Sequence, residues 1–123
     1  MSTPEDNAKT VNTYLELAAQ GRTDDIVDLY AEDATVEDPV GGEVHIGRQA
    51  IHGFYSAVNG VQRESELVSL RVAGSEAAFQ FRLTVTAGEH RMVIEPIDVM
   101  VFDDRGKVTA MKAYWSAADI TQL

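Results

Sequence analysis

The 123-residue sequence contains no cysteine. A disulfide, a thiol nucleophile and a thiolate metal site are therefore excluded, and the chain suits a reducing compartment. No apolar run approaches the roughly 20 residues that a membrane-spanning helix needs, and the first residues, MSTPED, lack the basic and apolar segments of a secretory signal. We therefore expect a cytoplasmic protein that does not enter a membrane.

Basic residues are scarce, because ten Lys and Arg stand against twenty Asp and Glu, for a net charge of −10. Binding to nucleic acid and adhesion to anionic membranes both depend on basic side chains, so neither partner is expected. His45, His52 and His90 do not have the spacing of metal ligands, and the chain has no glycine-rich phosphate loop. We therefore expect no metal bound by these histidines and no phosphate-binding loop.

Apolar residues make up 45% of the chain, which is typical of one compact domain over residues 1–123. The first half has helical spacing. A helix capped by Ser2 or Thr3 is expected to end at Gly21, and a shorter one that is capped by Thr23 would bury three residues. These three are Ile26, Leu29 and Tyr30. After Gly47, a third helix has apolar residues at helical spacing, namely Ile51, Phe54, Tyr55 and Val58.

The second half has strand-like patterns, separated by short glycine-containing or acidic turns. The expected strands are 64–72, 76–86, 90–102 and 107–115, which we expect to form an antiparallel meander. A short strand over 35–38 would follow a turn at 31–34. Three helices followed by several strands predict an α+β fold, with the helices in the concave face of a curved, mainly antiparallel sheet.

The segment 97–102, IDVMVF, would be apolar on both faces of a strand. Alternation places Asp98, Met100 and Phe102 on one face and the remaining three residues on the other. A face that met only water would carry polar residues, so the second face needs a cover. Either a second copy of the chain covers it, in a homodimer packed sheet to sheet, or the protein's own helices do.

Three polar residues stand where a core is expected. An ionised Asp98 would be costly between apolar neighbours, so it would be protonated or strongly hydrogen-bonded, unless it faces a loop or pairs with a distant Arg. Asp38 precedes Pro39 at the end of a strand, where it is either a fixed carboxylate or an ordinary turn residue. Tyr14 lies on the apolar stripe of the first helix, as a hydrogen-bond donor or simply as a core ring.

Together these residues supply one ionisable carboxylate and two candidate neutral donors. Those are the groups needed to remove a proton next to a carbonyl and to hold the resulting enolate. The sequence therefore indicates a site for carbon-acid chemistry without fixing its substrate.

Several sequence segments, in the same order along nearly the whole chain, resemble those of bacterial ketosteroid isomerase. They are Tyr14, AEDATVEDPVG at 31–41, IGRQAIHGFY at 46–55, PIDVMVFD at 96–103 and AYWS at 113–116. The resemblance implies the cone-like fold of nuclear transport factor 2, a homodimer and no cofactor.

By position, the resemblance makes Asp38 the general base and Tyr14 and Asp98 the oxyanion hole, with Tyr30 and Tyr55 extending a hydrogen-bond chain behind Tyr14. Five further residues match positions that line an apolar steroid pocket, although core packing explains each of them too: Phe54, Phe81, Met100, Met111 and Trp115. The implied reaction moves the double bond of a 3-oxo-Δ5-steroid to the conjugated Δ4 position.

Other readings remain open. Another enzyme of this fold, a polyketide cyclase, dehydratase or epoxide hydrolase, would also use a carboxylate, and a steroid- or lipid-binding module would keep the pocket alone. Residues 56–64 form a slightly shorter segment than in familiar members of the family, and we expect it near the pocket mouth. Glu95 is expected to face away from Asp98 by strand alternation.

Overall fold

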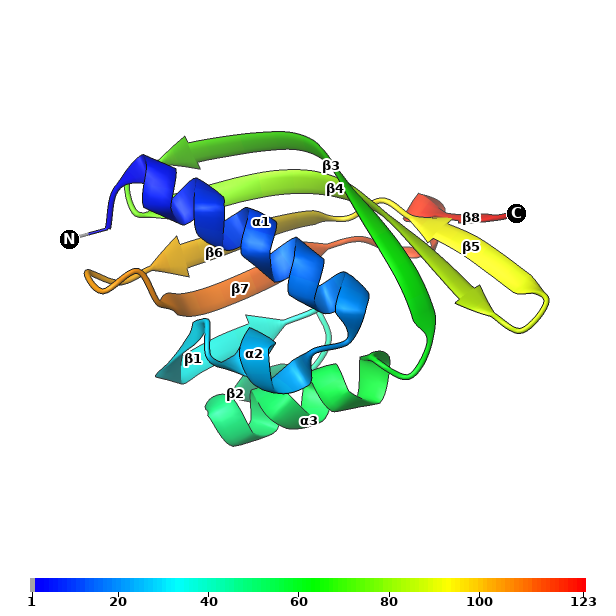
Figure 1. Cartoon of the computed structure of the whole chain (residues 1–123), viewed down its shortest axis with the longest axis horizontal. Helices are drawn as coiled ribbons and strands as arrows, with labels where there is room; N and C mark the ends of the chain where they lie inside the picture. The colour runs from blue at the N-terminus through cyan, green and yellow to red at the C-terminus, as the bar shows by residue number, and fades with distance from the viewer. Residues whose placement is uncertain (1) are drawn as a thin grey trace.

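The structure, a computed structural model, describes residues 2–123. Three helices lie against one large sheet (Figure 1). They are α1 (Pro4–Gln20), α2 (Thr23–Val27) and α3 (Arg48–Val58). Thr3 caps α1 in a capping box with Asp6, and Gly21 ends the helix in the left-handed conformation, at φ 69°. Both ends of this helix are therefore where the sequence predicts them.

Eight strands form the sheet, and nearly all neighbours are antiparallel. They are β1 (Tyr30–Glu37), β2 (Val44–Ile46), β3 (Gln62–Ala73), β4 (Glu76–Ala87), β5 (His90–Ile94), β6 (Ile97–Phe102), β7 (Val108–Tyr114) and β8 (Ile120–Gln122). A short 3₁₀ helix, η1 (Ala117–Asp119), precedes β8. The predicted α+β class is confirmed, with the helices packed on the concave face of the sheet (Figure 1).

The predicted meander is confirmed from β3 to β7, with one interruption. The expected strand 90–102 is broken at Glu95 and Pro96 into β5 and β6, which pair with successive parts of β4. Proline lacks the N–H that a strand ladder requires, which explains the break. The strands β2 and β8 and the helix η1 had no counterpart in the sequence-based expectation.

The prediction around residue 30 was wrong. Tyr30 begins β1 instead of belonging to α2, which ends at Val27, and the turn expected at 31–34 is part of the strand. The strand pairs in parallel with β7, from Tyr30 opposite Val108 onward, with an irregular register before Thr35. This pairing joins residues far apart in the sequence, so the local pattern could not reveal it.

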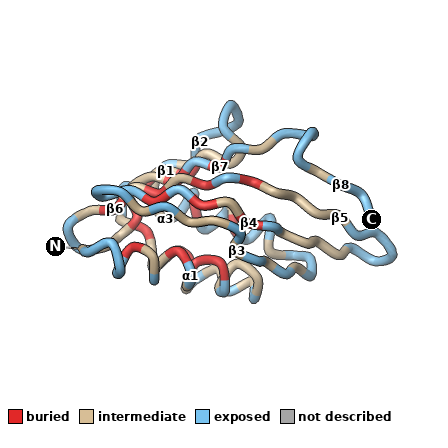
Figure 2. The backbone as a smooth tube through the Cα atoms, turned by 90° about the horizontal axis from the view of Figure 1, so that it is seen from above, coloured by how far each residue is buried: buried red, intermediate tan, exposed pale blue. Residues whose placement is uncertain are grey.

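The two faces of β6 differ as alternation predicts. Asp98, Met100 and Phe102 are buried, whereas Ile97 on the opposite face is 46% exposed. Figure 2 shows the buried segments gathered between the sheet and α1. The chain's own helices therefore lie on the Asp98 side and leave the second face uncovered, so the alternative in which they cover that face is wrong.

Candidate active site

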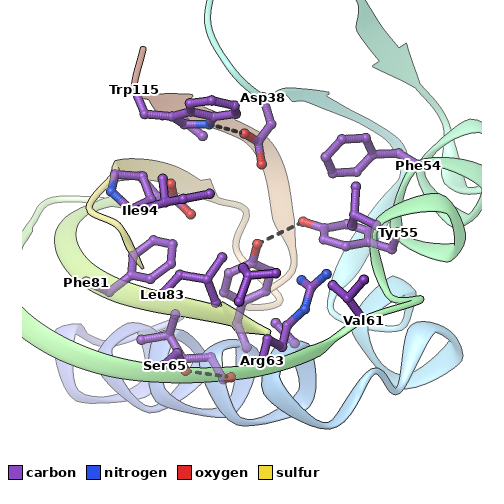
Figure 3. Close-up of a pocket in the computed structure, with 18 residues that line it drawn as sticks. Asp38, Phe54, Tyr55, Val61, Arg63, Ser65, Phe81, Leu83, Ile94 and Trp115 are labelled. Atoms are coloured by element: carbon purple, nitrogen blue, oxygen red, sulfur yellow. Dashed lines mark hydrogen bonds between the residues drawn. The ribbon is translucent and has the colours of Figure 1, made fainter. Parts of the chain in front are cut away.

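A pocket of ≈ 290 Å³ lies between α1, α3 and the concave face of the sheet (Figure 3). This is close to the lower end of the volume range of small-molecule sites, roughly 300–1,000 Å³. Most of its wall is apolar, with a few polar groups. The lining residues are Tyr14, Leu15, Ala18, Asp38, Phe54, Tyr55, Val58, Val61, Arg63, Ser65, Phe81, Leu83, Val85, Ile94, Pro96, Asp98, Ala113 and Trp115.

Three tyrosine hydroxyls form a buried chain that ends at the pocket. The Tyr14 hydroxyl lies 3.1 Å from that of Tyr55, which lies 2.6 Å from that of Tyr30. Tyr14 and Tyr55 line the pocket, and Tyr30 lies behind them in the core with no exposed surface. Burial raises the pKa of all three tyrosines above the ordinary value, so each keeps its proton at neutral pH.

Asp98 is the most deeply buried carboxyl group of the site. Its neighbours across the sheet are Phe79 and Ala113, and the residue is 1% exposed. Its Oδ1 atom is buried and has no hydrogen-bond partner among the described residues. Desolvation, and to a lesser extent the nearby charge of Asp38, raises the pKa of Asp98 well above its usual range. A carboxyl group in this position is neutral and can donate a hydrogen bond into the pocket.

Asp38 is placed very differently. It follows the last residue of β1, precedes Pro39 through a cis peptide bond and is about half-buried. The indole Nε1–H of Trp115 donates to its Oδ1 at 2.7 Å, as Figure 3 shows. Burial raises the pKa of Asp38, while this hydrogen bond and the charge of a protonated His45 act in the opposite direction. Two groups thus favour the ionised form here, whereas Asp98 has neither.

The structure brings one carboxyl group that accepts a hydrogen bond from an indole N–H, and two buried O–H donors, into one apolar pocket. A carboxylate can take a proton from a carbon atom beside a carbonyl, and neutral donors can hold the enolate oxygen that results. Among residues 2–123, no three His, Asp or Glu side chains gather closely enough to hold a metal ion. The arrangement can carry out acid–base chemistry with protein side chains alone.

Among the five residues expected on the pocket wall, Phe54, Phe81 and Trp115 lie there. Met100 and Met111 do not line the pocket and are at most 1% exposed. Their side chains extend from paired positions of β6 and β7 into the core, where they occupy the space between sheet and helices. Ligand contact by these two methionines stays a prediction.

Several lining residues escaped the sequence analysis, most notably Arg63. Alternation along β3 places Arg63 and Ser65 on a common face, with Leu83 and Val85 of β4 beside them, and Val61 lines the pocket just before the strand begins. The strand expected at 64–72 includes Ser65 but begins after Arg63, and nothing local showed which face of β3 would be turned inward. The segment 56–64 does lie at the pocket, through Val58, Val61 and Arg63.

Glu95 faces away from the pocket, as predicted. Its carboxylate lies 3.7 Å from the guanidinium of Arg82, and both side chains are substantially exposed. Glu95 therefore leaves the surroundings of Asp98 unchanged. No helix of residues 2–123 is long and apolar enough to cross a membrane.

Comparison with known proteins shows the family to which the chain belongs. Residues 11–111 match the SnoaL-like domain. The chain is 46% identical to the Steroid Delta-isomerase of Nocardioides simplex over 110 residues, 89% of each protein. The structure of the epoxide hydrolase/cyclase-like enzyme SalBIII, described for its role in pyran ring formation in polyether salinomycin, superimposes with a TM-score of 0.93 at 26% identity over the whole of both chains. The chain belongs to the SnoaL-like domain family, in the group that includes the ketosteroid isomerases.

Proposed function

We propose that this chain, acting as a single domain, is a steroid delta-isomerase that converts a 3-oxo-Δ5-steroid into its conjugated Δ4 isomer without a cofactor. The observation that carries the proposal is the placement of Tyr14, Asp38 and Asp98 around one apolar pocket. The 46% identity to a Steroid Delta-isomerase supports the same reaction.

In the proposed mechanism, the ionised Asp38 removes a proton from carbon 4 of the steroid. The dienolate that forms carries its negative charge on the oxygen of carbon 3, where Tyr14 and the neutral Asp98 each donate a hydrogen bond. Asp38 then returns the proton to carbon 6, so that the carboxylate is restored at the end of the turnover. Both proton transfers use one group, and no proton exchange with solvent is required.

The chain of tyrosine hydroxyls supports donation of a hydrogen bond from Tyr14 to the dienolate oxygen. When Tyr14 donates to the dienolate oxygen, its own oxygen is free to accept from Tyr55, and Tyr55 in turn accepts from Tyr30. Each donation makes the next hydroxyl a stronger donor, because hydrogen bonds in a chain polarise one another. Tyr30 and Tyr55 therefore act as positioning residues behind Tyr14.

The pocket wall fits a rigid, mostly apolar substrate. Phe54, Phe81 and Trp115 provide aromatic surface, and affinity for steroid rings follows from the apolar area that they bury. Only the carbonyl end of such a substrate needs polar partners, and the two O–H donors provide them.

The direct experiment mixes purified protein with a Δ5-3-ketosteroid and records the growth of the ultraviolet absorbance of the conjugated enone. We expect growth that depends on protein concentration. If the enone absorbance does not increase at a high concentration of folded protein, the proposed isomerase activity is overturned.

A second candidate is a cyclase or an epoxide hydrolase, and the structural similarity to SalBIII favours it. The same two carboxyl groups would then act as acid and base in the opening or closing of an oxygen-containing ring. Turnover of an epoxide in the absence of enone formation from the ketosteroid would support this candidate, whereas ligand binding without any turnover would support a binding module.

We also propose a homodimer through the outer face of β6 and β7. Ile97 and Tyr114 are paired across these strands, and each is 46% exposed. Apolar side chains on a broad sheet face are typical of a surface that a second copy covers. Sedimentation of the wild type at twice the monomer mass, and loss of that species in Ile97→Glu, are the expected results. A monomeric wild type contradicts the dimer. The cytoplasmic location stays a prediction from the sequence.

A further inference from the structure

Arg63 is the only Lys or Arg among the described residues that line the pocket. The mechanism above gives it no role, and the apolar rings of a steroid do not require it. Its side chain is half-buried and turned into the pocket (Figure 3). A charged side chain in this position needs a physical explanation.

Arg63 has no hydrogen-bond or ion-pair partner among residues 2–123. Its Nε atom is buried and makes no hydrogen bond, and none of the ion pairs among residues 2–123 includes its guanidinium. Burial lowers the pKa of Arg63, but a guanidinium remains protonated throughout the physiological range. A half-buried cation without an anion destabilises the free protein, so the unused N–H groups are available to a ligand.

The strand register places the backbone of Arg63 away from the oxyanion hole. Asp98 is paired with Phe79 of β4, whereas Arg63 is paired with Val85 of the same strand. These two positions on β4 are six residues apart, or about 20 Å along a strand. Burial also decreases in this direction, from 1% exposure at Phe79 to partial exposure at Val85. The backbone of Arg63 therefore lies at the open end of the pocket, and its long side chain reaches inward, where the nearby Tyr14 opposes the lowering of the Arg63 pKa.

The guanidinium selects among ligand groups. Its planar set of N–H donors matches a carboxylate in a two-point hydrogen bond, which is stronger and more specific than a bond to a neutral carbonyl or hydroxyl. The protein as a whole carries net charge −10 and repels anions, so an anionic ligand needs a local cation of this kind.

We infer that the pocket is built for a ketosteroid that also carries a carboxylate, and that Arg63 binds this carboxylate from the open end of the pocket. The inference rests on the proposed function and adds a substrate class to it. Arg63 is then a specificity-determining residue: it lowers KM for the anionic substrate and leaves the chemistry at carbons 4 and 6 to the groups at the other end.

The test compares two 3-oxo-Δ5-steroids that differ only in the remote side chain, one ending in a carboxylate and the other in its methyl ester. For the wild type we expect kcat/KM to favour the carboxylate by about 10-fold to 100-fold, mainly through KM. Arg63→Met should abolish this preference, because the loss of kcat/KM should fall mainly on the carboxylate substrate and be much smaller for the ester. Arg71→Met, which removes an exposed charge from the same strand, is the matched control and should keep the preference.

Two outcomes overturn the inference. One is a wild type without preference for the carboxylate. The other is an Arg63→Met variant that loses kcat equally on both substrates, because that result places the action of Arg63 at the ketone end. Should Arg63→Met not fold, Arg63→Lys takes its place, and it should retain only part of the preference because an ammonium cannot make the two-point bond.

A binding experiment tests the role of Arg63 independently of the proposed isomerase activity. Trp115 is the only tryptophan of the chain and lines the pocket, so its fluorescence reports binding without turnover. Titration with the conjugated Δ4 acid and with its methyl ester, in wild type and Arg63→Met, measures the role of Arg63 even if neither Δ5 steroid is converted. Tighter binding of the acid to the wild type alone supports the inference, and equal binding of acid and ester contradicts it.

Discussion

The two aspartates of the pocket lie in regions that differ in burial and in hydrogen-bond partners for the carboxyl group. Asp98 projects from the middle of β6 into the core, is 1% exposed and has an Oδ1 atom without a partner. Asp38 follows the end of β1, is half-buried and accepts a hydrogen bond from Trp115. Burial raises the pKa of both groups, but at Asp38 the hydrogen bond from Trp115 and the charge that His45 carries when protonated oppose the change.

This difference shows how one pocket can hold a base and an acid made from the same side chain. The protonation state depends on how many donors face the carboxyl group and on how far water is excluded. Position along a strand decides both, since the middle of a central strand is dry and its end is open to other groups. The mechanism requires this contrast, so the predictions below are ways to remove it or to measure it.

The largest expected effect comes from removing the base. Asp38→Asn should lower kcat by a factor on the order of 10² to 10⁴ or more, because an amide cannot accept the carbon-bound proton. Steady-state enone formation measures the change. Asp33→Asn, which removes an exposed carboxylate from β1, is the control and should retain activity. An unchanged rate in Asp38→Asn removes this residue from the role of base.

Removing one of the two hydrogen-bond donors to the dienolate oxygen should have the next largest effect. Tyr14→Phe should lower kcat by about 10² or more, since the lost hydrogen bond acts mainly on the dienolate and its transition state. The exposed Tyr114 provides the control, as Tyr114→Phe should leave kcat unchanged. A change in KM alone would make Tyr14 a binding residue.

Trp115→Phe should weaken the contrast between the two aspartates without removing either. The indole donor lowers the pKa of Asp38, so its loss raises that pKa further. Asp38 acts in its ionised form, and the acid limb of the kcat/KM profile should therefore move to higher pH. Phe81→Leu alters the pocket wall but no hydrogen bond to Asp38, and its acid limb should coincide with that of the wild type. A Trp115→Phe limb at the wild-type position contradicts the assigned role of the indole.

The smallest effect concerns stability, and it distinguishes the two regions by their response to pH. Asp98 binds its proton more tightly in the native than in the unfolded protein, whose ordinary pKa is 3.8. As pH rises above that value, the unfolded state ionises first, and the free energy of unfolding decreases by about 1.4 kcal/mol per pH unit until the native pKa is reached. Asparagine does not titrate, so the Tm of Asp98→Asn relative to wild type should increase with pH.

Thermal unfolding without ligand, from about pH 5 to about pH 8, measures this difference. A difference between Asp98→Asn and wild type that stays constant over this range means that Asp98 is ionised in the native protein.

The sequence predicts those features that depend on local chemistry. The cap at Thr3 and the end of the helix at Gly21 follow from side-chain hydrogen bonding and glycine conformation, and the inward face of β6 follows from alternation. Asp98 was recognisable because a carboxyl group between apolar neighbours contradicts the pattern around it. In contrast, the start of β1 at Tyr30 depends on pairing with distant β7, so local propensity gave the wrong element.

The candidate site could be predicted only in part for the same reason. The three polar residues stood out individually, but their meeting in one pocket depends on how α1, β1 and β6 pack. Arg63 had an ordinary polar-strand pattern, and Met100 and Met111 an ordinary apolar one. Which of them lines the pocket is decided by the curvature of β3 and β4 and by the depth of the core, neither of which is visible in a local pattern.

The central claim is that Asp38 is ionised and Asp98 neutral in the same pocket at neutral pH. Carbon-13 NMR of protein labelled at the aspartate carboxyl carbons measures both states directly, with Asp38→Asn and Asp98→Asn assigning the two signals. We predict that the Asp98 signal stays at the shift of a protonated carboxyl group at neutral pH while the Asp38 signal has the shift of a carboxylate. An Asp98 signal at the carboxylate position, or a protonated Asp38, would contradict the account.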